Sequence, residues 1–464
     1  MSERLVSDLQ TSLGDAVLVG DAIPERHYSD WTRLARCRPL ALVRPASTAE
    51  VAGVLRLCHA HRCPVVPQGG LTGLAGGAVP TGDSVALSLE RLAGDVYVDT
   101  AAGTLTTPAG TTLEAVQQAA ANAGLRYPVD FAARGSCQIG GNLATNAGGH
   151  AVIRHGMTRN QVLGLEVVLA DGCVLNLMNA MIKNNAGYDL KQYFIGSEGT
   201  LGVITRAVLR LAPPLGDTHT LLCAVDDYAS ATALLHRLRG AGLALEAFEV
   251  MWQDFYAMSC SWLETGPPMA ADFALYVLCE LEGDESRLHQ TLEASLAGRE
   301  IVDAVLAHSR TQARGLWKIR EATAEFSTRL APINFDISLP IGTIGEFVAE
   351  VRAALRARWP GCRSVSFGHI GDGNLHLTVD GNSLPDNDAE IQHAVESLIY
   401  DLVGRWHGSI SAEHGIGLLK REFLRHSVTS ESLATMRAVK HALDPLGILN
   451  PGKIFAAEPA GSAP

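Results

Sequence analysis

The sequence predicts an α+β protein in two domains, and three features of its 464 residues support this. The length exceeds what one hydrophobic core usually serves. Between residues 40 and 214, short apolar strand-like runs alternate with helical patterns and with three glycine-rich tracts. After Pro213-Pro214, strand-like runs and helices alternate in a way that is typical of helices packed on an antiparallel sheet.

The first domain is expected at residues 38–214, after an N-terminal helical segment at 1–37. The helix expected at 47–61 begins with Ser47 or Thr48 as N-cap, followed by Glu50. The other elements expected in this domain are strands at 40–43, 64–67, 84–89, 96–99 and 162–170 and a helix at 112–123.

The second domain is expected at 215–456, followed by a tail at 457–464. Its expected strands are 220–225 and 273–280, and its expected helices are 229–241, 285–296 and 311–329. A C-terminal helix is expected at 433–443. The turn signals Asp444-Pro445, Gly447 and Asn450-Pro451-Gly452 then end the ordered chain.

Composition argues against several classes of function. The formal net charge of −12 disfavours a nucleic-acid or anionic-membrane partner, because either would require a basic surface. No apolar run of 18 residues occurs, so no membrane span is expected, and the acidic N-terminus differs from a signal peptide. The nine cysteines form no C-x-x-C pair, which argues against an iron–sulfur cluster. Their odd number and wide spacing favour a reducing, cytoplasmic location.

The first glycine-rich tract, residues 68–77, follows a strand and contains five glycines. Such a backbone can approach a ligand closely and direct several N–H groups at an anion such as a pyrophosphate. It is neither a G-x-G-x-x-G fingerprint nor a P-loop. By itself, the tract also fits a flexible surface loop.

Two further glycine tracts strengthen the interpretation as a ligand site. Residues 135–149 mix glycines with Ser, Thr and Asn, whose side chains suit a ring system rich in nitrogens and carbonyls. Residues 196–202 add another point of close approach. Three unrelated turns would not be expected to cluster in this way within one domain.

Residues 38–214 resemble the FAD-binding domain of the vanillyl-alcohol oxidase/p-cresol methylhydroxylase superfamily. The resemblance implies a two-part FAD-binding domain and a substrate (cap) domain with an antiparallel sheet and a C-terminal helical segment. The first tract would bind the FAD pyrophosphate, and the second would lie along the flavin. The first tract has no match for the histidine that links flavin in some members, so FAD is expected to be non-covalent. His150 and His155 are interpreted as structural.

The residues expected to contact FAD come from these three tracts, from two residues beside them (Pro67 and Ile204) and from the C-terminal turn. They are Pro67, Gln68, Gly69, Gly70, Leu71, Thr72, Gly73, Leu74, Ser136, Gly140, Gly141, Asn142, Thr145, Asn146, Gly148, Gly149, Glu198, Gly199, Ile204 and Asn450.

A histidine pair marks the candidate chemistry of the second domain. Two strand-like runs flank Asp372-Gly373, which is a strong hairpin signal. A turn centred there would place His369 directly opposite His376, so that both rings share a face and can chelate one metal ion. Two histidines on a half-buried sheet without a metal would give the same pattern.

Glu413 and His414 lie side by side among small residues in Ser-Ala-Glu-His-Gly-Ile-Gly. Glu413 could complete a His₂Glu metal set, and His414 could act as general base. Oxidation of a 2-hydroxy acid transfers the C2 hydride to flavin while the hydroxyl loses a proton, which a metal ion and a base both assist. Arg320 is the candidate for the substrate carboxylate, although a surface salt bridge explains its position equally well.

Residues 38–456 are similar to the D-lactate, glycolate and D-2-hydroxyglutarate dehydrogenase branch of that superfamily. The similarity implies His369, His376 and Glu413 as ligands of a divalent metal, zinc first, with His414 as base. It also implies Asn374 near the substrate and Arg320 on a carboxylate, and Asp336 matches a family segment. It rests on Asp189-Leu190-Lys191-Gln192, residues 194–202, G-H-x-G-D-G-N-L-H at 368–376, S-A-E-H-G-I-G at 411–417 and residues 444–453.

Two departures from the branch concern the substrate. D-2-hydroxyglutarate enzymes are expected to carry Lys where this chain has Asn334, and a hydroxyl residue where it has Ala324, beside Thr323. D-2-hydroxyglutarate stays the first substrate expected. D-lactate, glycolate or a longer D-2-hydroxy acid is the alternative unless another cation, such as Lys191 or Arg421, binds the second carboxylate.

Other classes of function remain open at this stage. The chain could be an oxidase that uses oxygen, the flavin subunit of a glycolate oxidase-like complex, or a binding module without chemistry. No nicotinamide motif is present, so an electron-transfer flavoprotein or a quinone is the expected acceptor. The sequence leaves the oligomeric state open, with a homodimer as one alternative.

Overall fold

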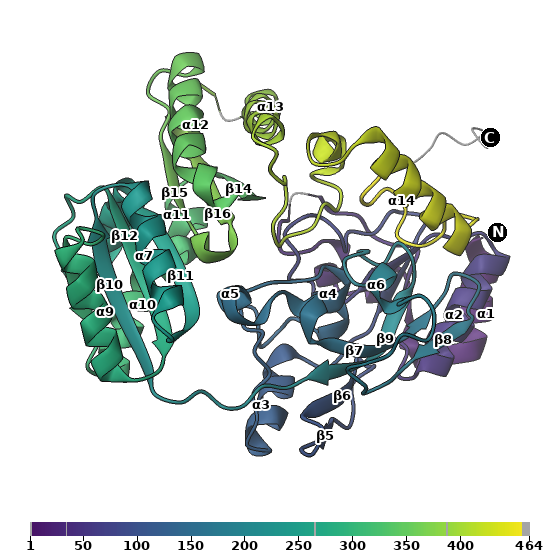
Figure 1. Ribbon diagram of the computed structural model, residues 1–464. Helices are drawn as coiled ribbons and strands as arrows, with labels where there is room; N and C mark the ends of the chain where they lie inside the picture. Colours follow the sequence, from purple (N-terminus) through teal and green to yellow (C-terminus); the bar gives the residue numbers. More distant parts are fainter. Residues whose placement is uncertain (1, 34, 264–265, 387, 457–464) are drawn as a thin grey trace. The chain divides into compact units, whose positions relative to one another are not determined.

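The computed structural model describes residues 2–33, 35–263, 266–386 and 388–456, and the expected tail at 457–464 lies outside these ranges. The chain forms two compact units, whose elements are labelled in Figure 1. Unit 1 comprises residues 1–149, 155–214 and 413–464, and unit 2 comprises residues 150–154 and 215–412.

Unit 1 contains two sheets. Strands β2, β4 and β3 run parallel, and β1 joins the edge of β2 in the antiparallel sense. The second sheet is antiparallel, in the order β5-β6-β9-β7-β8. The strands are β1 Val17–Leu18, β2 Ala41–Val43, β3 Val65–Gln68, β4 Val85–Ser88, β5 Tyr97–Asp99, β6 Thr104–Pro108, β7 Val162–Val168, β8 Val174–Leu177 and β9 Val203–Arg210.

The helices of unit 1 begin where the sequence offers caps. Ser47 accepts a hydrogen bond from the Glu50 N–H, and Thr112 accepts one from the Ala115 N–H, which satisfies donors that the first helical turn leaves unpaired. The helices are α1 Ser2–Leu13, α2 Thr48–Ala60, α3 Leu113–Asn122, α4 Ile139–Ala144, α6 Lys191–Phe194 and α14 Ser430–Leu443, and α5 Val152–His155 spans the boundary of the units.

Unit 2 is built on one antiparallel sheet of seven strands, in the order β13-β10-β12-β11-β15-β16-β14. The strands are β10 Thr218–Val225, β11 Ala244–Trp252, β12 Leu275–Glu282, β13 Asp303–Leu306, β14 Pro332–Ser338, β15 Ser364–Gly368 and β16 Asn374–Asp380. The helices are α7 Tyr228–Gly240, α8 Gln253–Trp262, α9 Glu285–Ala297, α10 Arg310–Arg320, α11 Phe326–Arg329, α12 Ile344–Arg358 and α13 Ala389–Arg405.

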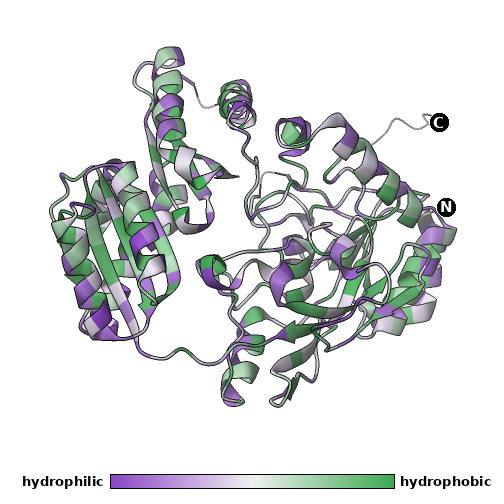
Figure 2. Ribbon diagram, viewed as in Figure 1, coloured by the Kyte–Doolittle hydropathy of each residue, from purple (hydrophilic) through white to green (hydrophobic). Residues whose placement is uncertain are grey.

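The mostly antiparallel sheets and their helices confirm the predicted α+β class. Each unit has its own apolar core. In unit 2, Phe255 and Tyr256 of α8 and Leu316 and Ile319 of α10 are buried together with apolar residues of the sheet. Figure 2 shows the central strands of this sheet in the hydrophobic colour and the outer helices in mixed colours. Neighbouring residues of β10, such as Leu221 and Leu222, are both fully buried, so both faces of the central part of this sheet are covered.

Three features differ from the sequence-based expectations. Residues 413–464 belong to unit 1 because the C-terminal segment extends its parallel sheet: Leu449 bridges Val65, and the Asn450 N–H donates to the Val65 carbonyl. Part of the second glycine tract forms helix α4. The helix expected at 311–329 is divided by a 3₁₀ turn at Glu321–Glu325.

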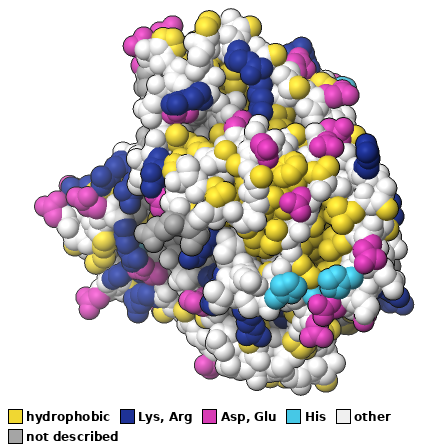
Figure 3. All heavy atoms as spheres, turned by 90° about the vertical axis from the view of Figure 1, so that its left-hand side faces the viewer, with side chains coloured by type: hydrophobic (Ala, Val, Ile, Leu, Met, Phe, Trp, Pro, Cys, Tyr) yellow, Lys and Arg dark blue, Asp and Glu magenta, His cyan; other side chains and the backbone are white. Residues whose placement is uncertain are grey.

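No helix of the described residues is long and apolar enough to cross a membrane. On the face in Figure 3, acidic and basic side chains are interspersed. All nine cysteines lie in the described ranges and are free thiols.

Candidate active site

The three glycine tracts of unit 1 surround one cavity of about 330 Å³, within the size range of small-molecule sites. Sixteen of the residues expected at FAD line it: Pro67, Gln68, Gly69, Gly70, Leu71, Thr72, Gly73, Leu74, Gly140, Gly141, Asn142, Thr145, Gly148, Glu198, Gly199 and Ile204. Glu413 and His414 also line this cavity.

The other four residues expected at FAD lie outside the cavity lining. Ser136 lines a neighbouring cavity of unit 1 that shares the walls Gly70, Leu71 and Thr72. Asn146 accepts a hydrogen bond from the Arg159 N–H. The Gly149 N–H donates to Glu413, and Asn450 donates to the Gly77 and Glu198 carbonyls. Asn146, Gly149 and Asn450 therefore support the loops that form the cavity.

The first tract presses directly against the second. A Cβ atom on Gly70 would lie 2.0 Å from the Ser136 carbonyl oxygen and 2.8 Å from Cys137 Cα, so no larger residue fits without a backbone shift. Leu71 adopts a left-handed conformation, with φ of 59°. The hydrogen bonds among the described residues leave the Gly70, Leu71 and Thr72 N–H groups without a protein acceptor. These donors fit an anionic ligand such as the FAD pyrophosphate.

The second tract supplies an acceptor for a ligand. Gln138 lines the cavity, and its Oε1 is buried without a hydrogen-bond partner among the described residues. A buried acceptor of this kind is costly unless a ligand or water fills the gap. The residues of the cavity therefore fit a flavin, which carries both donors and acceptors.

Glu198 holds the loop that carries Glu413 and His414. Its buried carboxylate accepts hydrogen bonds from the Ile416 N–H at 2.7 Å and the Gly417 N–H at 2.8 Å. Burial raises the pKa of Glu198, against these hydrogen bonds, which lower it. Glu198 also lines the cavity, so its expected role at the cofactor stays a prediction while its carboxylate supports the loop backbone.

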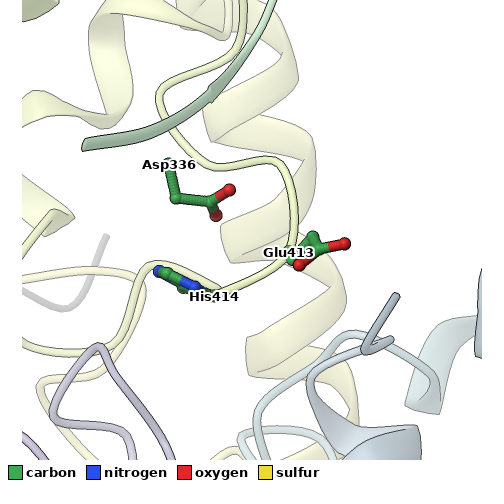
Figure 4. A group of neighbouring side chains, drawn as sticks. All are labelled: Asp336, Glu413 and His414. Atoms are coloured by element: carbon green, nitrogen blue, oxygen red, sulfur yellow. The ribbon is translucent and has the colours of Figure 1, made fainter. Parts of the chain in front are cut away.

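Glu413 and His414 leave the same loop in different directions (Figure 4). The Glu413 carboxylate accepts a hydrogen bond from the Gly149 N–H at 3.1 Å and lies 2.6 Å from where a Cβ on Gly148 would be. Asp336, which the same figure labels, comes from β14 of unit 2. Glu413 and His414, by contrast, belong to unit 1 and line its cavity.

The expected pairing of His369 with His376 is wrong, although their rings do meet. In the β15–β16 ladder, Phe367 is the residue opposite His376. The turn contains a 3₁₀ segment, Ile370–Asp372, and a left-handed Gly373, and is longer than a two-residue hairpin. Because the register differs by two residues, His369 keeps its face. The two ring centroids are 5.2 Å apart.

Glu249 of β11 links His369 to Arg320 in unit 2. Its side chain is 0% exposed, one oxygen contacts Nδ1 of His369, and the other accepts from Arg320 Nε at 2.6 Å. Burial alone would raise the pKa of Glu249, but the charges of His369 and Arg320 hold it well below its usual value. Burial raises the pKa of nearby Asp372 to about 6.

Arg320 is buried, which excludes the surface salt bridge considered from the sequence. Its guanidinium carbon lies 4.7 Å from the centroid of the Phe367 ring. Only Nε is used by Glu249, and within the described chain the two terminal nitrogens make no further hydrogen bond. That edge has the geometry for a bidentate contact with a carboxylate.

Asp336 gives His376 a carboxylate neighbour. The Asp336 oxygen lies 3.8 Å from His376 Nδ1 and accepts a hydrogen bond from Asn374 Nδ2 at 2.9 Å. Asn374 Oδ1 is buried and has no hydrogen-bond partner among the described residues. Asp336 and His376 are directly opposite in the β14–β16 ladder, so all three side chains share one face.

The next pair on the same face of this ladder is Asn334 and Thr378. Thr378 Oγ1 donates to Asn334 Oδ1 at 2.8 Å, which leaves the Asn334 amide nitrogen as a donor. Because strand side chains alternate, Asn334 lies on the same face as Asp336, one step further along the strand. This places the sequence departure at residue 334 on the face of the histidine cluster.

Other residues named from the sequence have contacts of their own. Lys191 pairs with Asp189 at 2.6 Å, and Arg421 donates to the Gly452 carbonyl. His155 contacts Arg126 within unit 1. The His150 ring lies 5.3 Å from the ring of Trp317.

Comparison with known families agrees with this architecture. Residues 39–178 match a family described as FAD binding domain, and residues 216–454 match FAD linked oxidases, C-terminal domain. The chain belongs to the FAD-linked oxidase family. It is an FAD-dependent oxidoreductase.

Curated relatives cover almost the whole chain. A D-2-hydroxyglutarate dehydrogenase of Xanthomonas citri pv. viticola is 42% identical over 98% of this chain and 98% of its own length. One of Stutzerimonas stutzeri is 38% identical over 98% and 99%. The mitochondrial D-2-hydroxyglutarate dehydrogenase of Bos taurus is 40% identical over 92% of this chain and 78% of its own length.

Solved structures share the fold at low sequence identity. p-Cresol methylhydroxylase with substrate bound has a TM-score of 0.75 at 16% identity and covers 98% of this chain and 97% of its own. Alkyldihydroxyacetonephosphate synthase has a TM-score of 0.74, also at 16% identity, over 97% and 84%. These likenesses confirm the predicted fold.

Sequence reasoning missed Glu249 and Gln138. Glu249 stands in Ala-Leu-Glu-Ala-Phe-Glu-Val-Met-Trp, a run that forms the buried strand β11. A carboxylate inside an apolar strand needs a cationic partner, and this signal could have drawn attention to it. Gln138 lies inside the second glycine tract, where the glycines and asparagines drew the interpretation instead.

Replacement of Gly70 tests the contact between the first two tracts. Gly70→Ala forces the first tract away from Ser136, so we expect it to lose most of its bound flavin. The flavin-to-protein absorbance ratio after gel filtration measures this loss.

Gly53→Ala is the matched control, because Gly53 lies in helix α2 outside the cavity lining and an added Cβ there would meet nothing within 4 Å. A Gly70→Ala protein with the parent's flavin content would show that the close approach of the tracts does not shape the cofactor site.

Proposed function

We propose that the protein oxidises a D-2-hydroxy acid to the corresponding 2-oxo acid, with D-2-hydroxyglutarate as first substrate. The observation that carries this proposal is the edge of Arg320 left open beside the ring pair His369 and His376, with Arg320 and His369 both bound to Glu249. Arg320 would bind the substrate carboxylate, and the histidine pair beside it would provide the site for the neighbouring C2 hydroxyl. The names of the full-length relatives support the choice of substrate.

In this proposal Arg320 binds the C1 carboxylate through its two terminal nitrogens. Asn374, whose Oδ1 has no partner among the described residues, contacts the substrate. His414 takes the proton of the C2 hydroxyl as general base. FAD, held without a covalent bond, supplies the hydride acceptor when bound.

We further propose His369 and His376, with Glu413 as third ligand, as the holders of one divalent metal ion, zinc first. Metal-binding histidines usually donate their second ring nitrogen to a carboxylate. Glu249 at Nδ1 of His369 fits this arrangement, and Asp336 lies 3.8 Å from Nδ1 of His376. In this proposal the Nε2 atom of each ring would bind the metal ion. A bound ion would lower the pKa of the substrate hydroxyl.

The electron acceptor is proposed to be an electron-transfer flavoprotein or a quinone, and the location cytoplasmic. The relatives include mitochondrial proteins from eukaryotes and bacterial ones. Oxygen as acceptor and a role as subunit of a glycolate oxidase-like complex are the alternatives. A homodimer is compatible with this scheme.

Turnover of D-2-hydroxy acids by the purified chain tests the proposed reaction. Reduction of an artificial dye should require the D isomer, with the highest kcat/KM for D-2-hydroxyglutarate among D-2-hydroxyglutarate, D-lactate and glycolate. Arg320→Lys, which keeps the charge but loses the fork, should lower kcat/KM by about 100-fold, the loss of one bidentate charge-assisted contact. A flavin-loaded chain that reduces no dye with any of these acids would favour the subunit alternative.

Chelation tests the metal proposal. Treatment with a chelator should abolish turnover and leave FAD bound, and added zinc, manganese or cobalt should restore activity. Metal analysis should find about one ion per chain in the parent and far less in His376→Ala. Unchanged activity of His376→Ala would contradict the proposal, and His289→Ala, which alters an exposed histidine of α9, serves as control.

Residue 334 tests how the far end of the substrate is recognised. The amide of Asn334 offers a neutral hydrogen bond, which is about half as strong as a charge-assisted one. Asn334→Lys should therefore raise the ratio of kcat/KM for D-2-hydroxyglutarate over D-lactate by about tenfold, while the neutral control Asn334→Gln should not. An unchanged ratio in Asn334→Lys would show that residue 334 does not face the substrate.

A further inference from the structure

Two buried carboxylates lie on strand β11, and they have different kinds of partner. Glu246 pairs with Arg154, which also pairs with Glu282 at 2.5 Å. Glu249, three residues further along the strand, pairs with Arg320 and His369. The first ion pair joins residues without an assigned role in chemistry, whereas the second joins two residues that carry the proposed function.

The two oxygens of Glu249 divide these partners between them. Oε1 faces Nδ1 of His369, and Oε2 accepts from Nε of Arg320 at 2.6 Å. An imidazole that donates from Nδ1 has its lone pair on Nε2. A guanidinium held at Nε has a fixed plane, and its two terminal nitrogens then point to the opposite side.

We infer that Glu249 is a positioning residue, because its one carboxylate orients both His369 and Arg320. It thereby fixes the direction of the His369 nitrogen that would bind the metal ion and of the Arg320 edge that would bind the substrate carboxylate. The inference rests on the proposed function and extends it. In this scheme Glu249 would act through His369 and Arg320, without itself binding the substrate or the metal ion. Because the carboxylate is buried and both partners are attached to it, a change in one oxygen disturbs two functional groups at once.

Backbone packing fixes the positions of Glu249, His369 and Arg320 relative to one another. Val250, next to Glu249, pairs with Gly368, next to His369, in the β11–β15 ladder. A Cβ on Gly368 would lie 2.4 Å from the Asn374 carbonyl oxygen, so the strands approach as closely as glycine allows. Arg320 ends helix α10, which packs on the same sheet and contributes Ile319 to the buried core. The three residues are therefore anchored by regular elements.

The test replaces the carboxylate by its isosteric amide. Glu249→Gln can accept from only one of the two donors, and its own NH₂ group then faces the other. We expect metal affinity, measured by chelator competition on the flavin-loaded protein, to fall about 10- to 100-fold. This is the usual loss when a carboxylate that hydrogen-bonds to a metal-binding histidine is replaced. KM for the hydroxy acid should rise several-fold in the same variant after it is saturated with metal.

Glu246→Gln is the matched control, because it removes a buried carboxylate from the same strand and leaves Arg320 and His369 untouched. It should lower the melting temperature without changing metal affinity or KM. If Glu249→Gln does not fold, Glu249→Asp provides the same readouts, since it keeps the charge but is too short to reach both partners.

The outcomes separate this inference from the proposed function. A parent protein that holds no metal and oxidises no hydroxy acid refutes the proposed function. A parent that does both, with Glu249→Gln and Glu249→Asp matching Glu246→Gln in metal affinity and KM, overturns the positioning role. Loss of metal affinity and a raised KM in the Glu249 variants alone supports it.

Discussion

The buried charge of Glu249 is the constraint on which the cluster in unit 2 depends. An ionised carboxylate without solvent is tolerated only when cations and hydrogen bonds surround it, and breaking one partner of such a pair costs roughly 3–5 kcal/mol. Arg320 and His369 meet this demand. Their own positions are thereby fixed, so the requirement of a stable fold and the requirement of a defined site coincide.

A second constraint acts in unit 1, between backbones. The first and second glycine tracts approach so closely that a single methyl group at Gly70 would overlap the Ser136 carbonyl. Glu198 joins the loop after His414 to the third tract, and Asn450 joins the C-terminal turn to the first and third tracts. The cavity wall is thus made of chain segments hundreds of residues apart, joined by buried polar groups that satisfy backbone donors and acceptors.

Much of this could be predicted from local sequence. The glycine tracts, the caps at Ser47 and the histidine pair are short-range signals, and each corresponds to a feature of the structure. The hairpin register could not be predicted, because the turn after His369 is a 3₁₀ segment and not a two-residue loop. Nor could the role of Glu249, whose partners are 71 and 120 residues away in the sequence. The assignment of residues 413–464 to unit 1 likewise depends on long-range pairing with Val65.

The most direct measurement of the central claim is diffraction at the zinc absorption edge from crystals of the flavin-loaded protein. The account predicts one anomalous peak bound by Nε2 of His369 and Nε2 of His376, with Glu249 on Nδ1 of His369. A map without a peak at these histidines, from protein that oxidises D-2-hydroxy acids, would contradict it. So would a metal ion bound to Nδ1 of His369 in place of Glu249.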